Sequence, residues 1–560
     1  MILFKESKSK EKIKQIKEHE YYRKDIERIN DIYEQIKNKP IEVLPKSKFC
    51  IFNETGNRLI YEDVYFERRT ELDICFLEYL LYKRKEDLTR LEDIIWAICG
   101  EFSWALPAHV GWKNAEDDMV IIDLFAAETA QSLGEILYIL NDKLSDYIKT
   151  IMKHEINRRV IESFEKNIQI WEKGLTNNWA AVCAGCVGMA FIYCAPERYA
   201  NVEKRIMSAL ENFLSGYGDD GICTEGLAYW NYGFGYYTYF AELLYEFSNG
   251  EKNIMNSKKV REIAQFQQRV YLSGNAVISF SDCDRNVDFD KGLTHKLKEL
   301  FPDCVTVPNR KYEKRNFYEN LNRFAICLRN LLWSKPEYAE DDTVYHTEKY
   351  YPEAQWYTSI TDKFGFAAKS GHNDEPHNHN DIGCFIIAAD NEQYIADIGN
   401  GEYTKEYFSS GRYDYLCCSS KGHSVPIIDG KLQSAGKEYR GKVLKAYGGK
   451  LITDIAGAYD ADGLTSAVRT FTLGENTVEL NDKFDFDDGK SHDIQECLIS
   501  LIEPEICDGY VKIEKLKILG MKNCKVLNSV ERGHYNEDVP VWRIICDVSD
   551  NEISLKFELE

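Results

Sequence analysis

The 560-residue sequence predicts an α+β multidomain protein in which a helical N-terminal part precedes an antiparallel β-sheet part. The length exceeds what one hydrophobic core usually serves. Apolar residues recur at helical spacing up to about residue 335, and they follow strand patterns from about residue 345 onward. Hydrophobic residues make up 44% of the chain and prolines number only 12, which indicates a folded protein rather than a disordered one.

The N-terminal part, residues 1–335, contains amphipathic segments separated by short stretches of Gly, Asn or Asp. The clearest helices are expected at 121–144, 179–193, 202–214 and 229–247. Many successive helices without a strict sequence repeat suggest a helical toroid or solenoid. The first 40 residues are rich in Lys and Glu, and we expect them to form a helix with a solvated face.

The C-terminal part, residues 336–560, shows pairs of strand-like runs around short turns, and the segment from Ser334 to Tyr350 is the expected linker. The turn Asp390-Asn391 is a hairpin signal. The paired runs are 384–389 with 393–398, 466–473 with 477–482, and 541–548 with 552–558. This pattern predicts an antiparallel β-sandwich.

Charge and cysteine usage exclude several classes of protein. The net charge of −22 argues against nucleic acid and anionic membranes as partners. No run approaches the roughly 18 apolar residues of a membrane span, and the N-terminus turns charged after four residues, unlike a secretory signal. The 17 cysteines are scattered and odd in number, which favours reduced thiols and a cytoplasmic location. For the CxxC pair Cys183 and Cys186 we expect helix packing, with a redox or zinc role as the alternative.

Histidines gather in one short segment, although the chain has only 11 of them. His377 and His379 begin the first predicted hairpin, and Asp397 ends its second strand, so Asp397 should return close to His379. Together, His379, Asp397 and His423 provide two imidazoles and a carboxylate, a set of ligands that suits zinc. Solvated loop histidines are the alternative. In an extended chain His377 and His379 point to opposite faces, so one can bind a metal while the other faces the substrate.

The string from His377 to Gly383 (His-Asn-His-Asn-Asp-Ile-Gly), followed by Asp397-Ile-Gly, Arg412-Tyr413 and Gly422-His423, resembles the heparinase II/III-like family of polysaccharide lyases. In the helical part, Thr-Asn177-Asn178-Trp and Glu225-Gly-Leu-Ala-Tyr229-Trp230-Asn-Tyr232-Gly resemble motifs of that family's toroid. The likeness spans about residues 100 to 430. It implies an incomplete (α/α) toroid followed by an antiparallel β-sandwich, with the active cleft between them.

The resemblance also implies site residues and a reaction. A structural zinc would fall on His379, Asp397 and His423. The expected reaction is β-elimination in a uronic-acid-containing glycosaminoglycan chain of heparin or heparan sulfate, chondroitin or hyaluronan type. It requires that the uronate carboxylate be neutralised, that a base take the C5 proton and that an acid reach the leaving oxygen.

Three residues are the expected catalysts, each with an alternative. Asn178 suits neutralisation of the carboxylate, while Asn177 is either a substrate contact or an N-cap. Tyr229 is the expected base or acid, since a nearby cation or imidazolium could lower the high pKa of tyrosine, and His377 is its partner.

Further substrate contacts are expected at Glu225, Tyr232, Arg412 and Tyr413. Tyr232 lies one helical turn after Tyr229 and is the rival catalyst. Trp230 is either a stacking platform for a sugar ring or a core residue.

Other functions remain open at the level of sequence. An oligoalginate lyase would use the same residues, and a non-catalytic carbohydrate-binding protein or a zinc hydrolase is possible on the same motifs. The expected partner is an acidic polysaccharide or oligosaccharide, with a homo-oligomer left open. The negative net charge favours a less sulfated substrate, since each sulfate requires its own cation.

Overall fold

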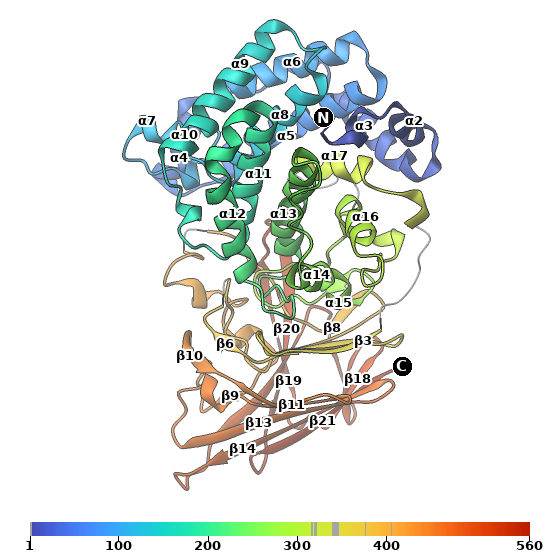
Figure 1. Ribbon diagram of the computed structural model, residues 1–560. Coiled ribbons are helices and arrows are strands. Elements are labelled where there is room, and N and C mark those ends of the chain that lie inside the picture. Colours follow the sequence, from blue (N-terminus) through green and yellow to red (C-terminus); the bar gives the residue numbers. More distant parts are fainter. Residues whose placement is uncertain (1–2, 315–316, 318–321, 339–345, 376, 405) are drawn as a thin grey trace.

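The computed structural model describes residues 3–314, 317, 322–338, 346–375, 377–404 and 406–560. Helices form the N-terminal part and sheets form the C-terminal part, and the two parts lie one above the other (Figure 1). This confirms the predicted fold class. In the described residues the α-helices are α1 Lys5–Lys8, α2 Lys10–Glu18, α3 Arg23–Ile36, α4 Lys46–Thr55, α5 Leu59–Tyr82, α6 Lys85–Cys99, α7 Ala115–Asp118, α8 Leu124–Leu140, α9 Asp146–Ile156, α10 Glu162–Lys166, α11 Asn178–Cys194, α12 Tyr199–Ser215, α13 Leu227–Phe247, α14 Lys258–Ala264, α15 Phe266–Val270, α16 Lys291–Leu300 and α17 Phe324–Leu332.

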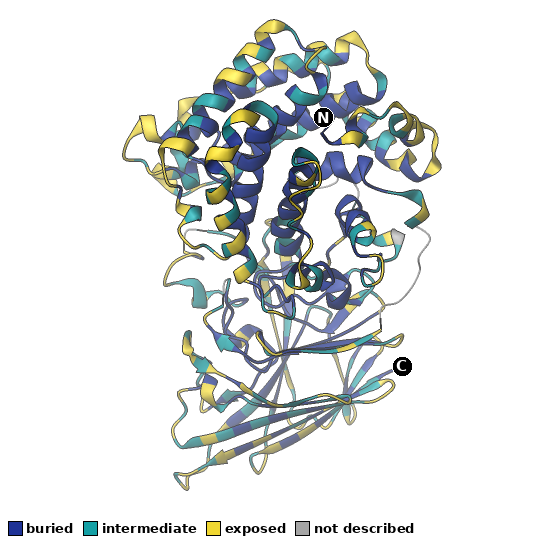
Figure 2. Ribbon diagram, viewed as in Figure 1, coloured by how far each residue is buried: buried dark blue, intermediate teal, exposed yellow. Residues whose placement is uncertain are grey.

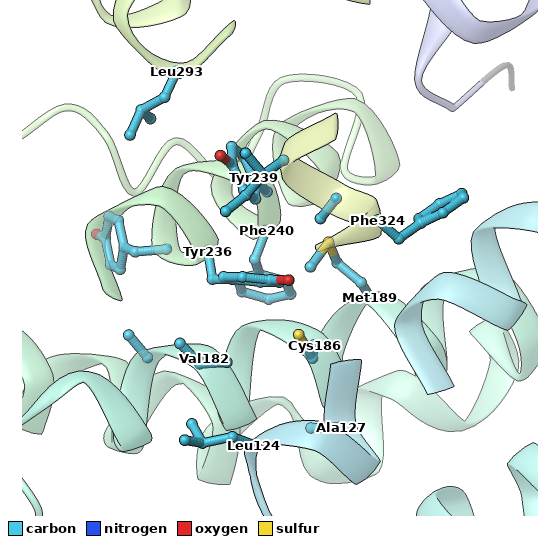
Figure 3. Packing of buried hydrophobic residues seen from close by; sticks show 14 of the residues in the cluster. Leu124, Ala127, Val182, Cys186, Met189, Tyr236, Tyr239, Phe240, Leu293 and Phe324 are labelled. Atoms are coloured by element: carbon cyan, nitrogen blue, oxygen red, sulfur yellow. The ribbon is translucent and has the colours of Figure 1, made fainter. Parts of the chain in front are cut away.

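Helices α8, α11 and α13 form the centre of the helical part. The α11 helix is apolar on all sides and buried along nearly its whole length, as expected for a helix surrounded by others. Gly188 lets α13 approach, because a Cβ there would lie 2.4 Å from the Phe240 ring. Cys183 and Cys186 are buried in this packing, as Figure 3 shows for Cys186. The outer helices expose one face, and the inner ones are buried throughout (Figure 2).

The N-terminal segment differs from its prediction. It forms three short helices, α1 to α3, rather than one helix with a solvated face. Tyr22 is fully buried, and its hydroxyl donates to the Ser334 carbonyl at 2.7 Å. The aromatic residues of this segment therefore attach it to the end of the helical part.

The C-terminal part contains antiparallel sheets with a shared core. A five-stranded sheet has the order β3-β4-β5-β7-β8, an eight-stranded sheet the order β11-β12-β13-β14-β21-β18-β17-β16, and a four-stranded sheet the order β19-β20-β15-β9. Phe366 and Phe385 of the first sheet pack against Phe471 of the second, as in a sandwich. The strands are β3 Thr347–Tyr351, β4 Trp356–Ile360, β5 Gly365–Lys369, β6 His372–Asn373, β7 Phe385–Ala389, β8 Glu392–Ile395, β9 Ile427–Ile428, β10 Gly436–Arg440, β11 Lys442–Ala446, β12 Lys450–Asp454, β13 Leu464–Leu473, β14 Thr477–Phe486, β15 Ile494–Ser500, β16 Glu505–Cys507, β17 Tyr510–Ile513, β18 Leu516–Leu519, β19 Lys525–Arg532, β20 Asp538–Asp547 and β21 Glu552–Leu559.

The predicted hairpins are confirmed in two of three cases. Strands β7 and β8 pair around Asp390 and Asn391, which have φ values of 52° and 75°, as a tight hairpin turn requires. Strands β13 and β14 also pair. The third predicted hairpin, 541–548 with 552–558, is wrong, because β20 belongs to the four-stranded sheet and β21 to the eight-stranded one. The Asp550-Asn551 turn therefore carries the chain from one sheet to the other.

A small hairpin in the helical part connects the two parts of the molecule. It consists of β1 (Tyr271–Ser273) and β2 (Ala276–Val277), which the sequence did not indicate. The Gln393 side chain of β8 donates to the Val277 carbonyl at 2.8 Å. The segment after β2 is thereby held against the five-stranded sheet. Among the described residues no helix has the length and apolar character needed to cross a membrane.

Candidate active site

A buried carboxylate, Asp282, joins the helical part to the β-sheet part. It accepts hydrogen bonds from His377 Nδ1 at 2.7 Å, from His379 Nε2 at 2.9 Å and from Arg412 at 3.0 Å to each oxygen. The Tyr407 hydroxyl donates to it as well. Burial opposes the charge, but the hydrogen bonds from both histidines hold the pKa of Asp282 well below its usual range.

Asp282 was not among the residues expected from the sequence. The segment Ser281-Asp282-Cys283-Asp284 lies just after the unanticipated β1–β2 hairpin, far from the histidine motif along the chain. Ser281 has a φ of 66°, an unusual backbone conformation that often marks functional loops. The two closely spaced acids were the available signal, but only tertiary contact shows that one of them meets His377.

His377 lies between two carboxyl groups. Its Nδ1 contacts Asp282, and its Nε2 lies 3.6 Å from Glu225 Oε1. Because Asp282 is ionised and accepts at Nδ1, the proton of a neutral His377 belongs on Nδ1, which leaves Nε2 as the reactive nitrogen. The φ of 56° at His377 is unusual for a side chain of this size.

Glu225 lies two residues before α13 and is buried. Burial raises its pKa, which the charge of His377 opposes, as does a hydrogen bond from the Asn178 backbone N–H. Its Oε1 has no hydrogen-bond partner among the described residues. Gly226 follows with a φ of 93°, and a Cβ there would lie 2.6 Å from Cys283, so this turn brings Glu225 close to the Asp282 segment.

Tyr229 faces the β-sheet part from the first turn of α13. Its ring lies 4.7 Å from the His377 ring, and its hydroxyl lies 2.9 Å from the Tyr403 hydroxyl. Burial raises the pKa of Tyr229 well above its usual value, and the charge of Asp282 adds to this. The expected lowering by a cation is therefore wrong, and Tyr229 is a phenol at neutral pH. We call Asp282, His377, Glu225, Tyr229 and Tyr403 the junction site.

Tyr403 was also missed, and it links the junction site to the C-terminal sheets. Its ring lies 4.3 Å from the ring of His534, in the turn between β19 and β20. Gly401 and Gly533 form an isolated bridge beside it. The resemblance seen in the sequence ends at about residue 430, whereas the β19–β20 hairpin beyond it reaches the junction site.

The two asparagines take different places at the start of α11. Asn177 is the N-cap, since its side chain accepts from the Trp179 backbone N–H at 3.2 Å. Asn178 is buried beside α13. A Cβ added to Gly233 of that helix would lie 3.2 Å from the Cβ of Asn178. Asn178 thus lies next to the helix that carries Tyr229, and its backbone contacts Glu225.

Other predicted contacts have protein partners. Trp230 is fully buried and donates to the Ile263 carbonyl at 2.9 Å, so it is a core residue and not a stacking platform. Arg412 pairs with Asp282 rather than facing an open cleft. Tyr413 accepts from the Asn378 side chain at 3.2 Å. The Tyr232 hydroxyl donates to Glu128, away from Tyr229.

Two buried groups of three side chains could hold a metal ion. One is Cys384, Asp397 and His423, and the other is Asp282, His379 and Cys418. The predicted ligands His379 and His423 thus fall in different groups, with ring centroids 5.4 Å apart. Cys384 was not foreseen as a ligand.

The donor sets of the two groups differ. Asp282 already accepts from Arg412 and both histidines, so a metal there would have to displace these partners. His423 Nδ1 lies 3.1 Å from Asp397 Oδ2, and Cys384 Sγ lies 3.8 Å from the same oxygen. A thiolate, a carboxylate and an imidazole without an arginine partner suit zinc.

Comparison with known proteins shows similarity of structure without similarity of sequence. No family model matches the chain, and no curated protein does. A mutant of heparan sulfate lyase HepC from Pedobacter heparinus aligns at 12% identity with a TM-score of 0.60, covering 90% of this chain and 77% of the other. Heparinase III aligns at 13% identity with a TM-score of 0.58, covering 98% and 91%.

A chondroitin AC lyase mutant from Streptomyces coelicolor aligns at 9% identity with a TM-score of 0.52, covering all of this chain and 83% of the other. The chain therefore has the fold of these polysaccharide lyases over nearly its full length. At such low identity the likeness establishes the fold, and the chemistry has to be argued from the chain's own residues.

Proposed function

We propose that this protein is a polysaccharide lyase that cleaves uronic-acid-containing glycosaminoglycan chains or oligosaccharides by β-elimination. The observation that carries the proposal is the junction site, where Tyr229 of the helical part meets His377 of the β-sheet part. Both residues belong to motifs that resemble those of the lyases. The similar folds of heparan sulfate and chondroitin lyases support the substrate class.

In the proposed reaction His377 Nε2 takes the proton from C5 of the uronate. The C5–H electron pair becomes the C4=C5 double bond while the C4–O4 bond breaks. The Tyr229 hydroxyl, which its raised pKa keeps protonated at neutral pH, gives its proton to O4. Return of the proton from His377 to Tyr229 then restores the starting state.

Neighbouring residues prepare this reaction. Asp282 holds Nδ1 of His377 protonated and stabilises the imidazolium that forms, as the carboxylate of a catalytic triad does. Asn178 can donate from its carboxamide to the uronate carboxylate without adding a charge that titrates. Tyr403 orients the Tyr229 hydroxyl.

We also propose a structural zinc at Cys384, Asp397 and His423, with His379 beside it. Its ligands would connect β7, the end of the β8 hairpin and the His423 loop. The His379 Nδ1 atom is buried without a hydrogen-bond partner among the described residues, which fits an additional ligand in this region. When bound, zinc would hold the segment that carries His377.

The test is to incubate the protein with heparan sulfate, heparin, chondroitin, hyaluronan and oligoalginate and to measure ultraviolet absorbance. A lyase gives an unsaturated, absorbing product from at least one glycosaminoglycan. Absorbance with oligoalginate alone would identify an oligoalginate lyase instead. New reducing ends without absorbance would indicate a hydrolase, and binding without either would indicate a non-catalytic protein.

A further inference from the structure

A row of four aromatic rings extends from the junction site over the β-sheet part. The rings belong to Phe408, Tyr403, His534 and Tyr535, and we call them the aromatic row. Neighbouring ring centroids lie 4.9 Å apart for Phe408 and Tyr403, 4.3 Å for Tyr403 and His534, and 4.9 Å for His534 and Tyr535. Because Tyr403 belongs to the junction site, the aromatic row continues that site outward.

The two ends of the aromatic row are open to solvent. Phe408 is 55% exposed and Tyr535 is 69% exposed, although the Phe408 ring lies only 6.5 Å from the ring of His377. The preceding residue, Tyr407, is fully buried and donates its hydroxyl to Asp282, so adjacent side chains of one loop point in opposite directions. Exposed aromatic rings that continue a polar site are typical of a ligand-binding surface.

Hydrogen bonds hold the outer end of the aromatic row in place. In the turn between β19 and β20, the Gly533 N–H donates to the Glu537 carbonyl at 2.9 Å, and the Tyr535 N–H donates to the Glu537 carboxylate at 2.9 Å. The Tyr535 hydroxyl donates to Asp284 Oδ2 at 3.2 Å. The exposed ring of Tyr535 is therefore held in one orientation, which reduces the entropy lost when a ligand binds to it.

The proposed reaction determines which sugars would meet the aromatic row. Tyr229 gives its proton to O4, and O4 leaves with the sugar on the non-reducing side of the uronate. The Tyr403 hydroxyl lies 2.9 Å from the Tyr229 hydroxyl, so Tyr403 lies beside the position of O4. The sugar attached through O4 would therefore lie next to the aromatic row, whereas the uronate itself would lie against His377.

We propose that the aromatic row is the subsite for the sugars on the leaving side of the cleaved bond, and that Phe408 and Tyr535 bind them by stacking. The proposal rests on the proposed lyase function for the position of O4. The C–H groups on one face of a pyranose ring pack on an aromatic ring, and this contact requires no charge on the sugar. Phe408 and Tyr535 are thus binding residues and take no part in proton transfer.

Binding of matched oligosaccharides tests the proposal separately from turnover. A tetrasaccharide that is cleaved at its middle bond has two sugars on the leaving side, whereas the disaccharide with the uronate at its non-reducing end has none. Both are prepared from unsulfated heparosan and from unsulfated chondroitin. Calorimetry measures their affinities for the Tyr229→Phe protein, so that the ligand survives.

We expect the tetrasaccharide of at least one series to bind more tightly than its disaccharide, because only the tetrasaccharide reaches the aromatic row. Equal affinity of tetrasaccharide and disaccharide in both series would overturn the proposal. Absence of binding by both tetrasaccharides would overturn it as well.

Single substitutions in the same background test the residues. Phe408→Ala and Tyr535→Ala should each weaken tetrasaccharide binding about tenfold, the size of one aromatic contact, and leave disaccharide binding unchanged. Tyr535→Phe loses the hydrogen bond to Asp284 but keeps the ring, so we expect the affinity to stay within about twofold. Tyr147→Ala is the control, since it removes an 82% exposed tyrosine from α9, on the side of the helical part away from the sheets (Figure 1).

The outcomes separate this proposal from the lyase function. An ultraviolet-absorbing product together with tetrasaccharide binding that neither alanine substitution weakens would reject the subsite and keep the lyase. Tetrasaccharide binding that depends on Phe408 or Tyr535, without a product from any uronate, would reject the lyase and uphold stacking of a sugar on the row. Equal weakening of disaccharide binding would overturn the assignment to the leaving side. Because both side chains are exposed, their removal should leave the fold intact, which the melting temperature checks.

Discussion

Tyr229 and Tyr232 lie one helical turn apart on α13, yet their surroundings differ. Tyr229 faces the β-sheet part, where it contacts the ring of His377 and the hydroxyl of Tyr403. Tyr232 faces α8, where its hydroxyl donates a hydrogen bond to Glu128 and the Arg323 guanidinium lies over its ring. One helix therefore presents one tyrosine to the junction site and the other to a salt bridge between helices.

The difference shows how environment assigns roles to identical side chains. Burial raises the pKa of both tyrosines well above the usual value. Only Tyr229 lies beside a histidine whose Nδ1 is held by a carboxylate. Tyr232 is held by a salt bridge and lacks an adjacent general base, so it suits binding rather than proton transfer.

Replacing each tyrosine by phenylalanine should give the largest contrast. Tyr229→Phe removes the proposed acid, so we expect kcat to fall by about 10²–10⁴-fold. Tyr232→Phe removes one hydrogen bond to Glu128, and we expect less than about a tenfold loss in kcat/KM. Steady-state kinetics by ultraviolet absorbance measures both. Near-normal turnover in Tyr229→Phe with a large loss in Tyr232→Phe would exchange their roles.

Asp282→Asn tests what distinguishes the surroundings of Tyr229. Loss of the carboxylate leaves Arg412 and two histidines without a charged partner, so we expect a loss of about 3–5 kcal/mol in the free energy of unfolding. We expect kcat to fall at least about tenfold, because the Nδ1 proton of His377 is no longer fixed. Urea denaturation and kinetics measure the two effects. Full activity in a folded Asp282→Asn protein would remove Asp282 from the mechanism.

The pH dependence gives a second test of the same carboxylate. Because the folded-state pKa of Asp282 lies below its unfolded value, its contribution to stability is present above the ordinary aspartate pKa. That contribution is lost as the pH falls toward the folded-state value. The free-energy difference between wild type and Asp282→Asn should therefore narrow in acid. A difference that is constant down to strongly acidic pH would contradict the assignment.

Loss of the metal group should have the smallest effect on activity, because Cys384, Asp397 and His423 are not part of the junction site. Cys384→Ser replaces a soft donor, so we expect zinc affinity to fall about 10–100-fold and the melting temperature to fall by a few degrees. Metal analysis and thermal denaturation, with and without a chelator, measure this. Cys546→Ser, a buried cysteine outside both groups, is the control. Unchanged metal content in Cys384→Ser would return the site to the predicted set of His379, Asp397 and His423.

Much of the fold could be predicted from local patterns. The helices α8, α11, α12 and α13 lie where helical spacing placed them, and the Asp390-Asn391 turn forms its hairpin. These features depend on residues close in the chain. The prediction that β20 pairs with β21 was wrong. Local patterns indicate where a strand lies, but the sheet that it joins depends on contacts with residues far away in the sequence.

The sequence by itself determined the two-part architecture, the α13 motif and the histidine motif, because each is a short pattern of residue types with its own physical meaning. Only the tertiary structure decided that Asp282 binds His377 and that Tyr229 meets Tyr403. It also placed Trp230 in the core and Cys384 beside His423. Asp282 and His377, like Tyr229 and Tyr403, lie far apart along the chain, so they meet only after the helical and β-sheet parts have packed together.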